Sequence, residues 1–243
     1  MVIPAHDEAE NIGPLIREVR AALARAPEVA DWEIVVVDDG SDDGTGARAT
    51  ELACDVPHLT VVRHPRKAGQ SFALLSGVRA ATAPWIATLD GDGQNDPADI
   101  PGLLAARERE ASARAAGAAG PARGPLLLAG HRATRRDTWL KRVSSRIANG
   151  VRGRLLGDRT PDTGCGLKLF EREAFLALPH FDHMHRFLPA LFLRAGGRVV
   201  SVPVGHRPRT RGRSHYGVRN RLFVGIVDLF GVMWLMRRGE RTG

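Results

Sequence analysis

The sequence predicts an α/β fold in which helices flank a mostly parallel central sheet. Short runs rich in β-branched residues alternate with longer amphipathic segments, which is typical of a parallel sheet covered by helices. Helix start signals precede the longer segments, as at Asp7, at Ser41 and at Asp96-Pro97. Because connections between parallel strands are right-handed, we expect the strand ends to meet at one edge, where ligands of open α/β sheets bind.

The elements follow from this alternation in chain order. In the first 130 residues we expect strands over 1–4, 32–38, 59–64, 85–90 and 126–130, and helices near 9–26, 43–54, 70–82 and 97–119. The remainder is more irregular, with a helix near 137–156, a turn at 162–164, a strand over 167–170, helices near 171–178 and 185–195, and a strand over 198–204. A Gly- and Arg-rich loop and a last helix over 218–238 complete the chain.

The apolar part of the last helix is too short to cross a membrane. Residues 222–236 would extend roughly 22 Å as a helix, less than the ~30 Å of a hydrocarbon core. Arginines flank this run, and Phe230 and Trp234 lie within it, so an amphipathic helix on an anionic membrane surface is one expectation. A helix packed on the domain, on a second copy or on a membrane partner subunit is the equal alternative.

Length and cysteine content suggest one large intracellular domain with an appendage. At ~150 residues per domain, 243 residues fit a domain over 1–217 followed by a helix and tail over 218–243. Cys54 and Cys165 cannot form a disulfide framework or a four-thiolate zinc site. No charged and apolar leader precedes the first expected strand, so we expect a cytoplasmic location.

The net charge of +8 is unevenly distributed. Residues 1–97 hold 16 acidic and 8 basic side chains, whereas residues 183–227 hold nine arginines and no acid. This contrast suggests a local anion site in the second part of the chain. A basic nucleic-acid-binding protein is a remote alternative, because the arginines lack interleaved aromatic residues and the acidic part would repel phosphate. We therefore expect no nucleic acid partner.

The strongest local signal is the run of acids and glycines after the expected strand 85–90. Asp90 and Asp92 alternate in an extended segment, so their side chains can converge, while Gly91 and Gly93 permit close backbone approach. Oxygen-only ligands favour Mg²⁺ or Mn²⁺ over zinc. The sequence therefore predicts a divalent metal site that a diphosphate would complete.

Acids follow two other strands as well. Asp38 and Asp39 end the second strand, and Asp7 and Glu8 follow the first. Carboxylates are good acceptors for ribose hydroxyls or a base N–H, although helix capping is the alternative for Asp7 and for 41–43. No Gly-x-Gly-x-x-Gly or Walker-type loop is present at the right places, which argues against a dinucleotide oxidoreductase or a P-loop ATPase.

The order of these motifs resembles the family 2 glycosyltransferases of GT-A fold, and among them the polyprenyl-phosphate (dolichyl-phosphate) mannose synthase-like branch. The resemblance spans nearly the whole chain, and its Rossmann-like sheet agrees with the predicted fold. It rests on Ile3-Pro4-Ala5 with Glu8 and Asn11, Val37-Asp38-Asp39-Gly40-Ser41, Asp90-Gly91-Asp92 with Gln94 and Pro97, Asp162 with Gly166-Leu167-Lys168-Leu169-Phe170, and Arg209 with Gly212 and Ser214.

The resemblance implies roles for individual residues. The nucleoside pocket would be formed by Pro4, His6, Glu8, Val37, Asp39, Asp90 and Gly91. The metal would be held by Asp92 and Gln94, with Asp90 beside them, and the phosphates would be contacted by Arg209, Ser214 and His215. Residues 1–97 would then be a nucleotide and metal half, and 98–217 an acceptor half. His215 departs from the lysine usual in this branch, and its charge would depend on pH.

The chemistry of the acceptor decides which further residues are needed. The metal would stabilise the leaving diphosphate, which makes Asp92 a catalytic residue together with Arg209. A hydroxyl acceptor would also need a general base, for which Asp162 is the candidate. An ionised lipid phosphate would need only positioning and charge compensation, which suits arginine. The candidates for this task are Arg132, Arg186, Arg207, Arg209 and Arg211.

These observations predict a metal-dependent, inverting glycosyltransferase. It would move a hexose from a GDP-mannose or UDP-glucose type of donor to a polyprenyl phosphate at the cytoplasmic membrane face, as a peripheral protein. The nearer alternative is a soluble family 2 transferase that acts on a sugar or protein hydroxyl.

Overall fold

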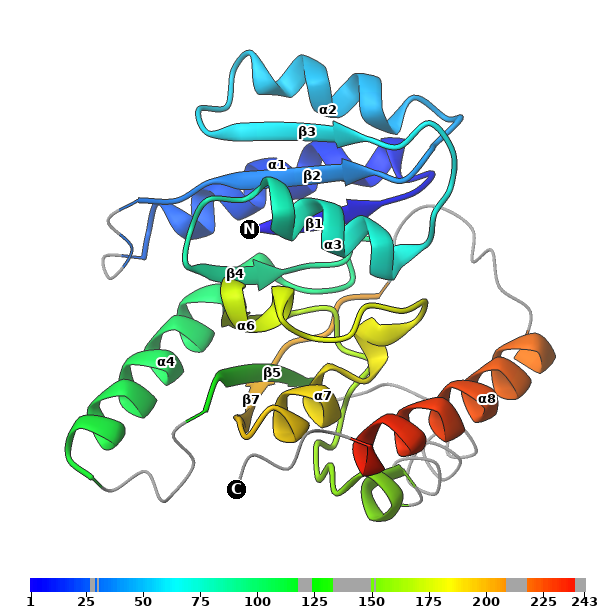
Figure 1. Ribbon diagram of the computed structural model, residues 1–243. Helices are drawn as coiled ribbons and strands as arrows, with labels where there is room; N and C mark the ends of the chain where they lie inside the picture. Colours follow the sequence, from blue (N-terminus) through cyan, green and yellow to red (C-terminus); the bar gives the residue numbers. More distant parts are fainter. Residues whose placement is uncertain are drawn as a thin grey trace.

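A single sheet organises the computed structural model, which describes residues 1–26, 29, 31–117, 124–132, 150, 152–208 and 218–238. Its strand order is β3-β2-β1-β4-β6-β5-β7 (Figure 1). The strands are β1 (Val2–Ala5), β2 (Ile34–Asp38), β3 (Leu59–Arg63), β4 (Trp85–Thr88), β5 (Leu126–Arg132), β6 (Lys168–Glu171) and β7 (Arg198–Val204). Neighbouring strands are parallel except that β6 runs antiparallel to β4 and β5. The predicted mostly parallel α/β sheet is thus confirmed.

Helices cover both faces of the sheet because successive strand residues point to opposite sides. Ile3 belongs to the core cluster under one set of helices, and its neighbour Val2 to the cluster under the other. The first set is α1 (Ala9–Leu23), α2 (Thr45–Ala53) and α4 (Ile100–Ala115), which follows the 3-10 turn η1 (Pro97–Asp99). The second is α3 (Gln70–Ala80), α6 (Arg172–Leu176), η2 (Met184–Arg186), α7 (Leu188–Arg194) and α8 (Val218–Arg237).

The predicted element boundaries need several corrections. The helix expected near 97–119 is a 3-10 turn followed by α4, because Asp96 caps Ala98 and Pro97 occupies the first position. The helix expected near 185–195 is divided into η2 and α7. The helix expected near 137–156 lies mostly outside the described residues, which are helical at 150 and over 152–156.

Helix α8 is fixed to the second helical set by one of its faces. Val232 is fully buried in that core cluster, with Leu229 and Met233 packed against it. The Arg194 guanidinium donates to the Leu235 carbonyl at 3.0 Å, and His183 Nδ1 lies 3.0 Å from Asp228 Oδ2. Among the helices in the described residues, none is both long and apolar enough to cross a membrane.

The contact between α3 and the sheet has no room for a side chain at Gly77. A Cβ built there would collide with the side chain of Val2 on β1 and would touch that of Val37 on β2. Gly77, Val2 and Val37 are all buried, so the two valine side chains cannot move aside into solvent. The glycine therefore sets how closely α3 approaches the two strands whose ends carry the acids.

We expect Gly77→Ala to destabilise the protein by about 1–3 kcal/mol, because overpacking outweighs the gain in helix propensity. Gly102→Ala on α4 is the matched control, since its Cβ would meet open space. That change should be neutral or stabilising by up to about 1 kcal/mol. Urea unfolding of both variants measures the difference, and equal stabilities would contradict this account of the α3 contact.

Candidate active site

The acids predicted from three separate motifs meet at one edge of the sheet. Strands β2, β1 and β4 are adjacent and parallel, so their carboxyl ends lie side by side (Figure 1). The segments that leave these ends carry Asp39, Glu8 and Asp90. The edge also receives Gln70 from the start of α3, whose Nε2 donates to Asp90 Oδ1 at 2.7 Å. The predicted convergence of the motifs is therefore present in the fold.

Asp90 occupies a strongly constrained position between charges of both signs. Burial and the nearby Asp92 carboxylate raise the pKa of Asp90 to about 6, against the opposing influence of Lys168 and Arg132. A Cβ at Gly166 would collide with the Asp90 carboxylate, so only glycine fits there without displacing the acid. The raised pKa therefore reflects a buried carboxylate that lies near a second one.

The residues after β4 fit a divalent cation. Asp92 is partly exposed, and its Oδ1 accepts a hydrogen bond from the Gln94 backbone N–H at 3.1 Å, which orders the turn. Asp90 and Asp92 offer carboxylate oxygens, the donors that Mg²⁺ and Mn²⁺ prefer. Within the described ranges no three His, Cys, Asp or Glu side chains are grouped to hold a metal. A cation here would thus need oxygens from a ligand or from water.

Asp39 organises the loop that leads into α3. Its carboxylate accepts hydrogen bonds from the backbone N–H groups of Ala68 and Gly69, both at 2.8 Å, and lies 2.8 Å from His64 Nδ1. Burial raises the pKa of Asp39, but these hydrogen bonds outweigh it and hold the pKa below its usual value. The His6 ring lies 2.9 Å from the Asp39 carbonyl, which brings two predicted nucleoside residues together.

The other predicted nucleoside residues divide into edge and core positions. Pro4 lies at the end of β1, where its carbonyl is close to Gly91. Glu8 is buried, and its carboxylate accepts a 2.6 Å hydrogen bond from Asn11. Val37 is fully buried beneath α3, so its side chain faces the core and only its backbone lies near the edge. Asp43 accepts from the Thr45 N–H at the start of α2 and from the Ala9 N–H at the start of α1, both at 2.9 Å, although the N-cap residue of α2 is Gly44.

Asp162 is held by Arg132 in a buried two-point ion pair. Arg132 Nε donates to Asp162 Oδ2 at 2.7 Å, and Nη2 donates to Oδ1 at 2.9 Å. Burial lowers the pKa of Arg132, but its bonds to Asp162 outweigh this and raise it above the ordinary value. Asp162 is only 5% exposed, so both of its oxygens are occupied. The pairing favours an acid that orders the loop before β6.

Two further cations hold the same loop. The Lys168 ammonium, buried on β6, donates to the carbonyls of Thr163 and Cys165, and burial lowers its pKa. Arg152 donates to the Thr160 carbonyl at 3.0 Å and lies 3.3 Å from Asp158. Arg132, Lys168 and Arg152 therefore all bind the loop over 158–166. This loop places Gly166 directly against the Asp90 carboxylate.

The structure describes only some of the residues that were predicted to contact the acceptor phosphate. Arg186 lies on η2 and is half-buried. Arg207 lies beyond β7 and pairs with Glu18 and Asp96. The other candidates, Arg209, Arg211, Ser214 and His215, lie outside the described residues.

Sequence reasoning did not assign a role to Gln70, Ser71 or His185. Ser71 Oγ lies 2.9 Å from His185 Nδ1, which joins α3 to η2. Burial first, and then the charges of Arg186, Lys168 and His183, hold the pKa of His185 well below its usual value, so the ring is neutral. Neither Ser71 nor His185 belongs to a run of acids, and no pattern in the sequence indicated that their side chains would meet.

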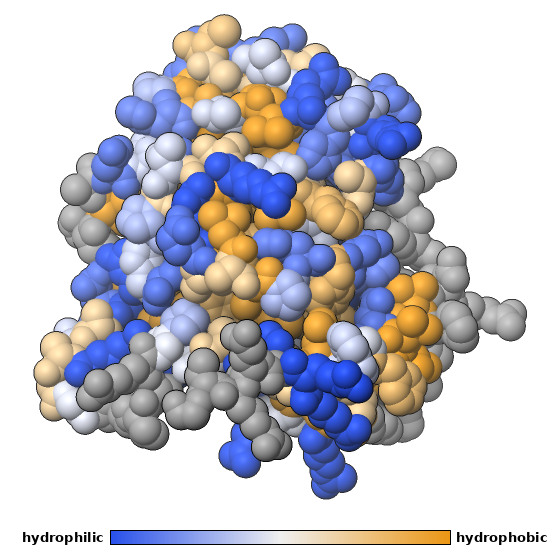
Figure 2. Space-filling view, viewed as in Figure 1, coloured by the Kyte–Doolittle hydropathy of each residue, from blue (hydrophilic) through white to orange (hydrophobic). Residues whose placement is uncertain are grey.

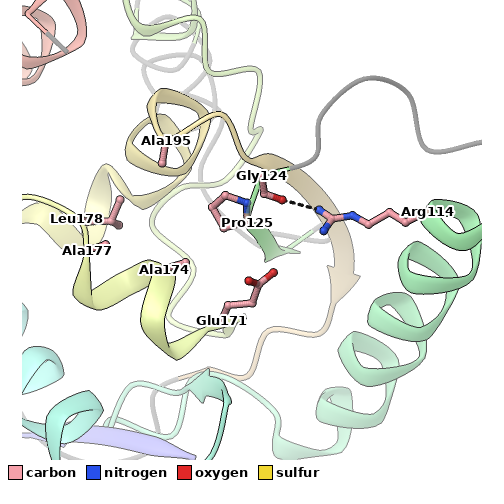
Figure 3. A pocket seen from close by; sticks show the side chains of 8 residues that line it. All are labelled: Arg114, Gly124, Pro125, Glu171, Ala174, Ala177, Leu178 and Ala195. Carbon is pink, nitrogen blue, oxygen red and sulfur yellow. Dashed lines mark hydrogen bonds between the residues drawn. The ribbon is translucent and has the colours of Figure 1, made fainter. Parts of the chain in front are cut away.

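A separate cavity of about 460 Å³ lies at the opposite end of the sheet, where β5 and β7 begin (Figure 3). Figure 3 shows Arg114 of α4 reaching the Gly124 carbonyl at its rim, with the Glu171 carboxylate on the other side. Apolar residues form the remaining lining: Pro125, Ala174 of α6, Ala177 and Leu178 directly after that helix, and Ala195 before β7. This cavity is therefore distinct from the edge that carries the acids.

Solved structures share the fold at low sequence identity. Glucosyl-3-phosphoglycerate synthase from Mycobacterium tuberculosis, solved with Mn²⁺ and UDP-glucose, superposes with a TM-score of 0.66 at 20% identity, over 95% of this chain and 78% of that one. Mannosyl-3-phosphoglycerate synthase from Rubrobacter xylanophilus gives a TM-score of 0.66 at 18% identity, over 100% of this chain and 75% of that one. These likenesses confirm the predicted GT-A fold.

Sequence relatives and a family model give the assignment. Dodecaprenyl-phosphate galacturonate synthase of Rhizobium johnstonii is 35% identical over 247 residues, covering 100% of this chain and 68% of the relative. Undecaprenyl-phosphate 4-deoxy-4-formamido-L-arabinose transferase of Enterobacter sp. is 31% identical over 230 residues, and the match covers 94% of this chain but only 64% of that relative. The model of glycosyl transferase family 2 matches residues 1–178. The chain therefore belongs to glycosyl transferase family 2 and is a glycosyltransferase.

Proposed function

We propose that this enzyme transfers a hexose, with inversion, from a nucleoside-diphosphate sugar to a polyprenyl phosphate, and that it requires Mg²⁺ or Mn²⁺. The observation that carries the proposal is the carboxylate pair Asp90 and Asp92 at the end of β4. Burial first, and then repulsion from Asp92, raises the pKa of Asp90, and a cation shared with a diphosphate would offset both. The named relatives, which are a dodecaprenyl-phosphate and an undecaprenyl-phosphate enzyme, support the same acceptor class.

The state of Asp162 favours a phosphate over a hydroxyl as the acceptor. A hydroxyl must lose a proton as it attacks, so the enzyme needs a base with a free oxygen near the acceptor. Asp162 was the candidate, but both of its oxygens are engaged by Arg132. A phosphate monoester is already ionised at neutral pH and needs no base. Cationic groups such as Arg186 would then position it and offset its repulsion from the donor.

The nucleotide would occupy the edge formed by β1 and β2. Asp39 and His6 lie there together, and the ordered loop after β3 provides backbone groups beside them. Asp92 and Gln94, with Asp90 beside them, would hold the divalent metal, which when bound stabilises the negative charge that develops on the departing diphosphate. Gln70 and the Gly166 loop keep Asp90 in place for this task. Asp92 is thus assigned as catalytic through charge stabilisation.

An anionic membrane surface is the proposed partner of α8, with the enzyme peripheral to the inner face of the cell membrane. The face of α8 that does not pack on the domain exposes Ile226, Val227, Phe230 and Trp234. Figure 2 shows this apolar patch beside strongly hydrophilic groups. Arg237 and Arg238 end the helix, and Arg238 lies over the Trp234 ring. Aromatic and aliphatic side chains next to arginines are typical of helices that bind an anionic interface.

We expect Asp92→Asn to lower the rate of sugar transfer by at least about a hundredfold, because removal of a preorganised charge-stabilising group has this scale of effect. The assay incubates purified protein with Mn²⁺, a panel of radiolabelled GDP- and UDP-sugars, and undecaprenyl phosphate in detergent. Product is extracted into organic solvent and counted.

Asp55→Asn is the control, since Asp55 is an exposed acid that follows α2, outside the segments that leave the carboxyl ends of the strands, and this variant should have near-normal activity. Transfer by Asp92→Asn at the normal rate would contradict the metal role. Transfer to soluble sugar or peptide hydroxyls, with none to the lipid phosphate, would contradict the acceptor.

Replacing both Phe230 and Trp234 by serine should weaken binding to vesicles that contain 30% anionic lipid by about tenfold or more, because two large apolar side chains leave the interface. Phe72→Ser on α3, also an exposed aromatic, is the control and should bind normally. Co-sedimentation with the vesicles measures the affinity. Equal binding by all three proteins would show that α8 does not contact the membrane.

A further inference from the structure

The chain that leaves β7 returns to the turn that carries the metal-binding acids. The Gly205 backbone N–H donates to Asp99 Oδ2 at 2.8 Å, and the Arg207 N–H donates to the Gln94 carbonyl at 2.9 Å. Gln94 lies two residues after Asp92, in the same turn. Thus the segment after the edge strand β7 is hydrogen-bonded to the segment after β4, across the ends of β6 and β5.

The Arg207 side chain adds two ion pairs to this backbone contact. Its Nη2 donates to Asp96 Oδ1 at 2.7 Å, and its Nη1 donates to Glu18 Oε2 on α1 at 2.5 Å. Asp96 Oδ1 also accepts from the Ala98 N–H at 2.9 Å, which starts η1. Arg207 therefore joins α1, the end of the acidic turn and the exit of β7 through one guanidinium.

The charges around Arg207 disfavour a direct contact with an acceptor phosphate. Both terminal nitrogens of the guanidinium donate to carboxylates, Glu18 and Asp96, and Asp99 lies close by through its bond to Gly205. These two bonds use two of the five N–H donors of the guanidinium, so a phosphate on the remaining donors would lie beside two carboxylates that repel it. This arrangement differs from that of a phosphate-binding arginine, whose donors point at the ligand.

We propose that Arg207 is a positioning residue that fixes the Asp92–Asp96 turn, and that it does not bind the acceptor phosphate. The turn is held at its start by β4 and at its end by Arg207, so loss of the guanidinium frees the end nearer to Gln94 and Asp96. Asp92 must then be ordered by the cation itself, at a cost in affinity. The consequence for metal binding rests on the proposed function, whereas the ordering of the turn does not.

The test compares Arg207→Ala with Arg207→Lys and with Arg198→Ala. Arg198 is the matched control, because it is at the other end of β7 and pairs with Glu110 of α4 at 3.2 Å. Calorimetric titration with Mn²⁺ alone should show about fivefold weaker binding for Arg207→Ala, the scale of a partly exposed ion pair with hydrogen bonds. We expect partial rescue by lysine, which keeps the charge but lacks the two-pronged geometry, and normal binding by Arg198→Ala.

A second measurement is independent of the metal. Amide hydrogen exchange in the metal-free protein should become faster over residues 92–99 in Arg207→Ala and remain unchanged there in Arg198→Ala. If the wild-type protein fails to bind Mn²⁺, the proposed metal role fails, and the exchange result alone decides the role of Arg207. Unchanged exchange over 92–99, with a raised KM for undecaprenyl phosphate in Arg207→Ala, would overturn the proposal and assign Arg207 to the acceptor.

Discussion

The balance of charge at the end of β4 is the constraint on which the rest of the site depends. Burial of Asp90 costs most and the repulsion from Asp92 adds to it, so that the pKa of Asp90 rises to about 6. Lys168 and Arg132 approach from the other side, but they are engaged with the loop over 158–166 and with Asp162. The cation proposed above would add positive charge on the side of the two carboxylates.

Close packing at two glycines fixes the positions of the elements that surround these charges. Gly166 allows the loop before β6 to lie against the Asp90 carboxylate, and Gly77 allows α3 to lie close to β1 and β2. Helix α3 in turn supplies Gln70 to Asp90 and Ser71 to His185. Neither glycine has a side chain that could take part in the reaction. Each allows two elements to lie closer together than any other residue would permit.

Patterns within a short stretch of sequence predicted most of the fold and the acidic edge. The strands ending at Asp38 and Thr88 have strong apolar runs, and the acids follow directly, so their place at a common edge follows from parallel connections. The antiparallel direction of β6 was not predictable, because a run of four residues does not encode its orientation. The partners of Arg132 and Arg207 were also beyond local reasoning, since Asp162 is 30 positions and Asp96 111 positions away in the chain.

The 3.0 Å contact between His183 Nδ1 and Asp228 Oδ2 connects the segment before η2 to helix α8. His183 has a left-handed backbone, with φ of 63°, and is followed directly by η2, which carries Arg186. Asp228 lies on α8, two positions before the exposed Phe230 and six before the exposed Trp234. Together with the packing of Val232 and the hydrogen bond from Arg194 to Leu235, this contact ties α8 to the helices that precede it in the chain. If α8 binds a membrane and Arg186 the acceptor, as proposed, a displacement of α8 would reach the acceptor site through these contacts.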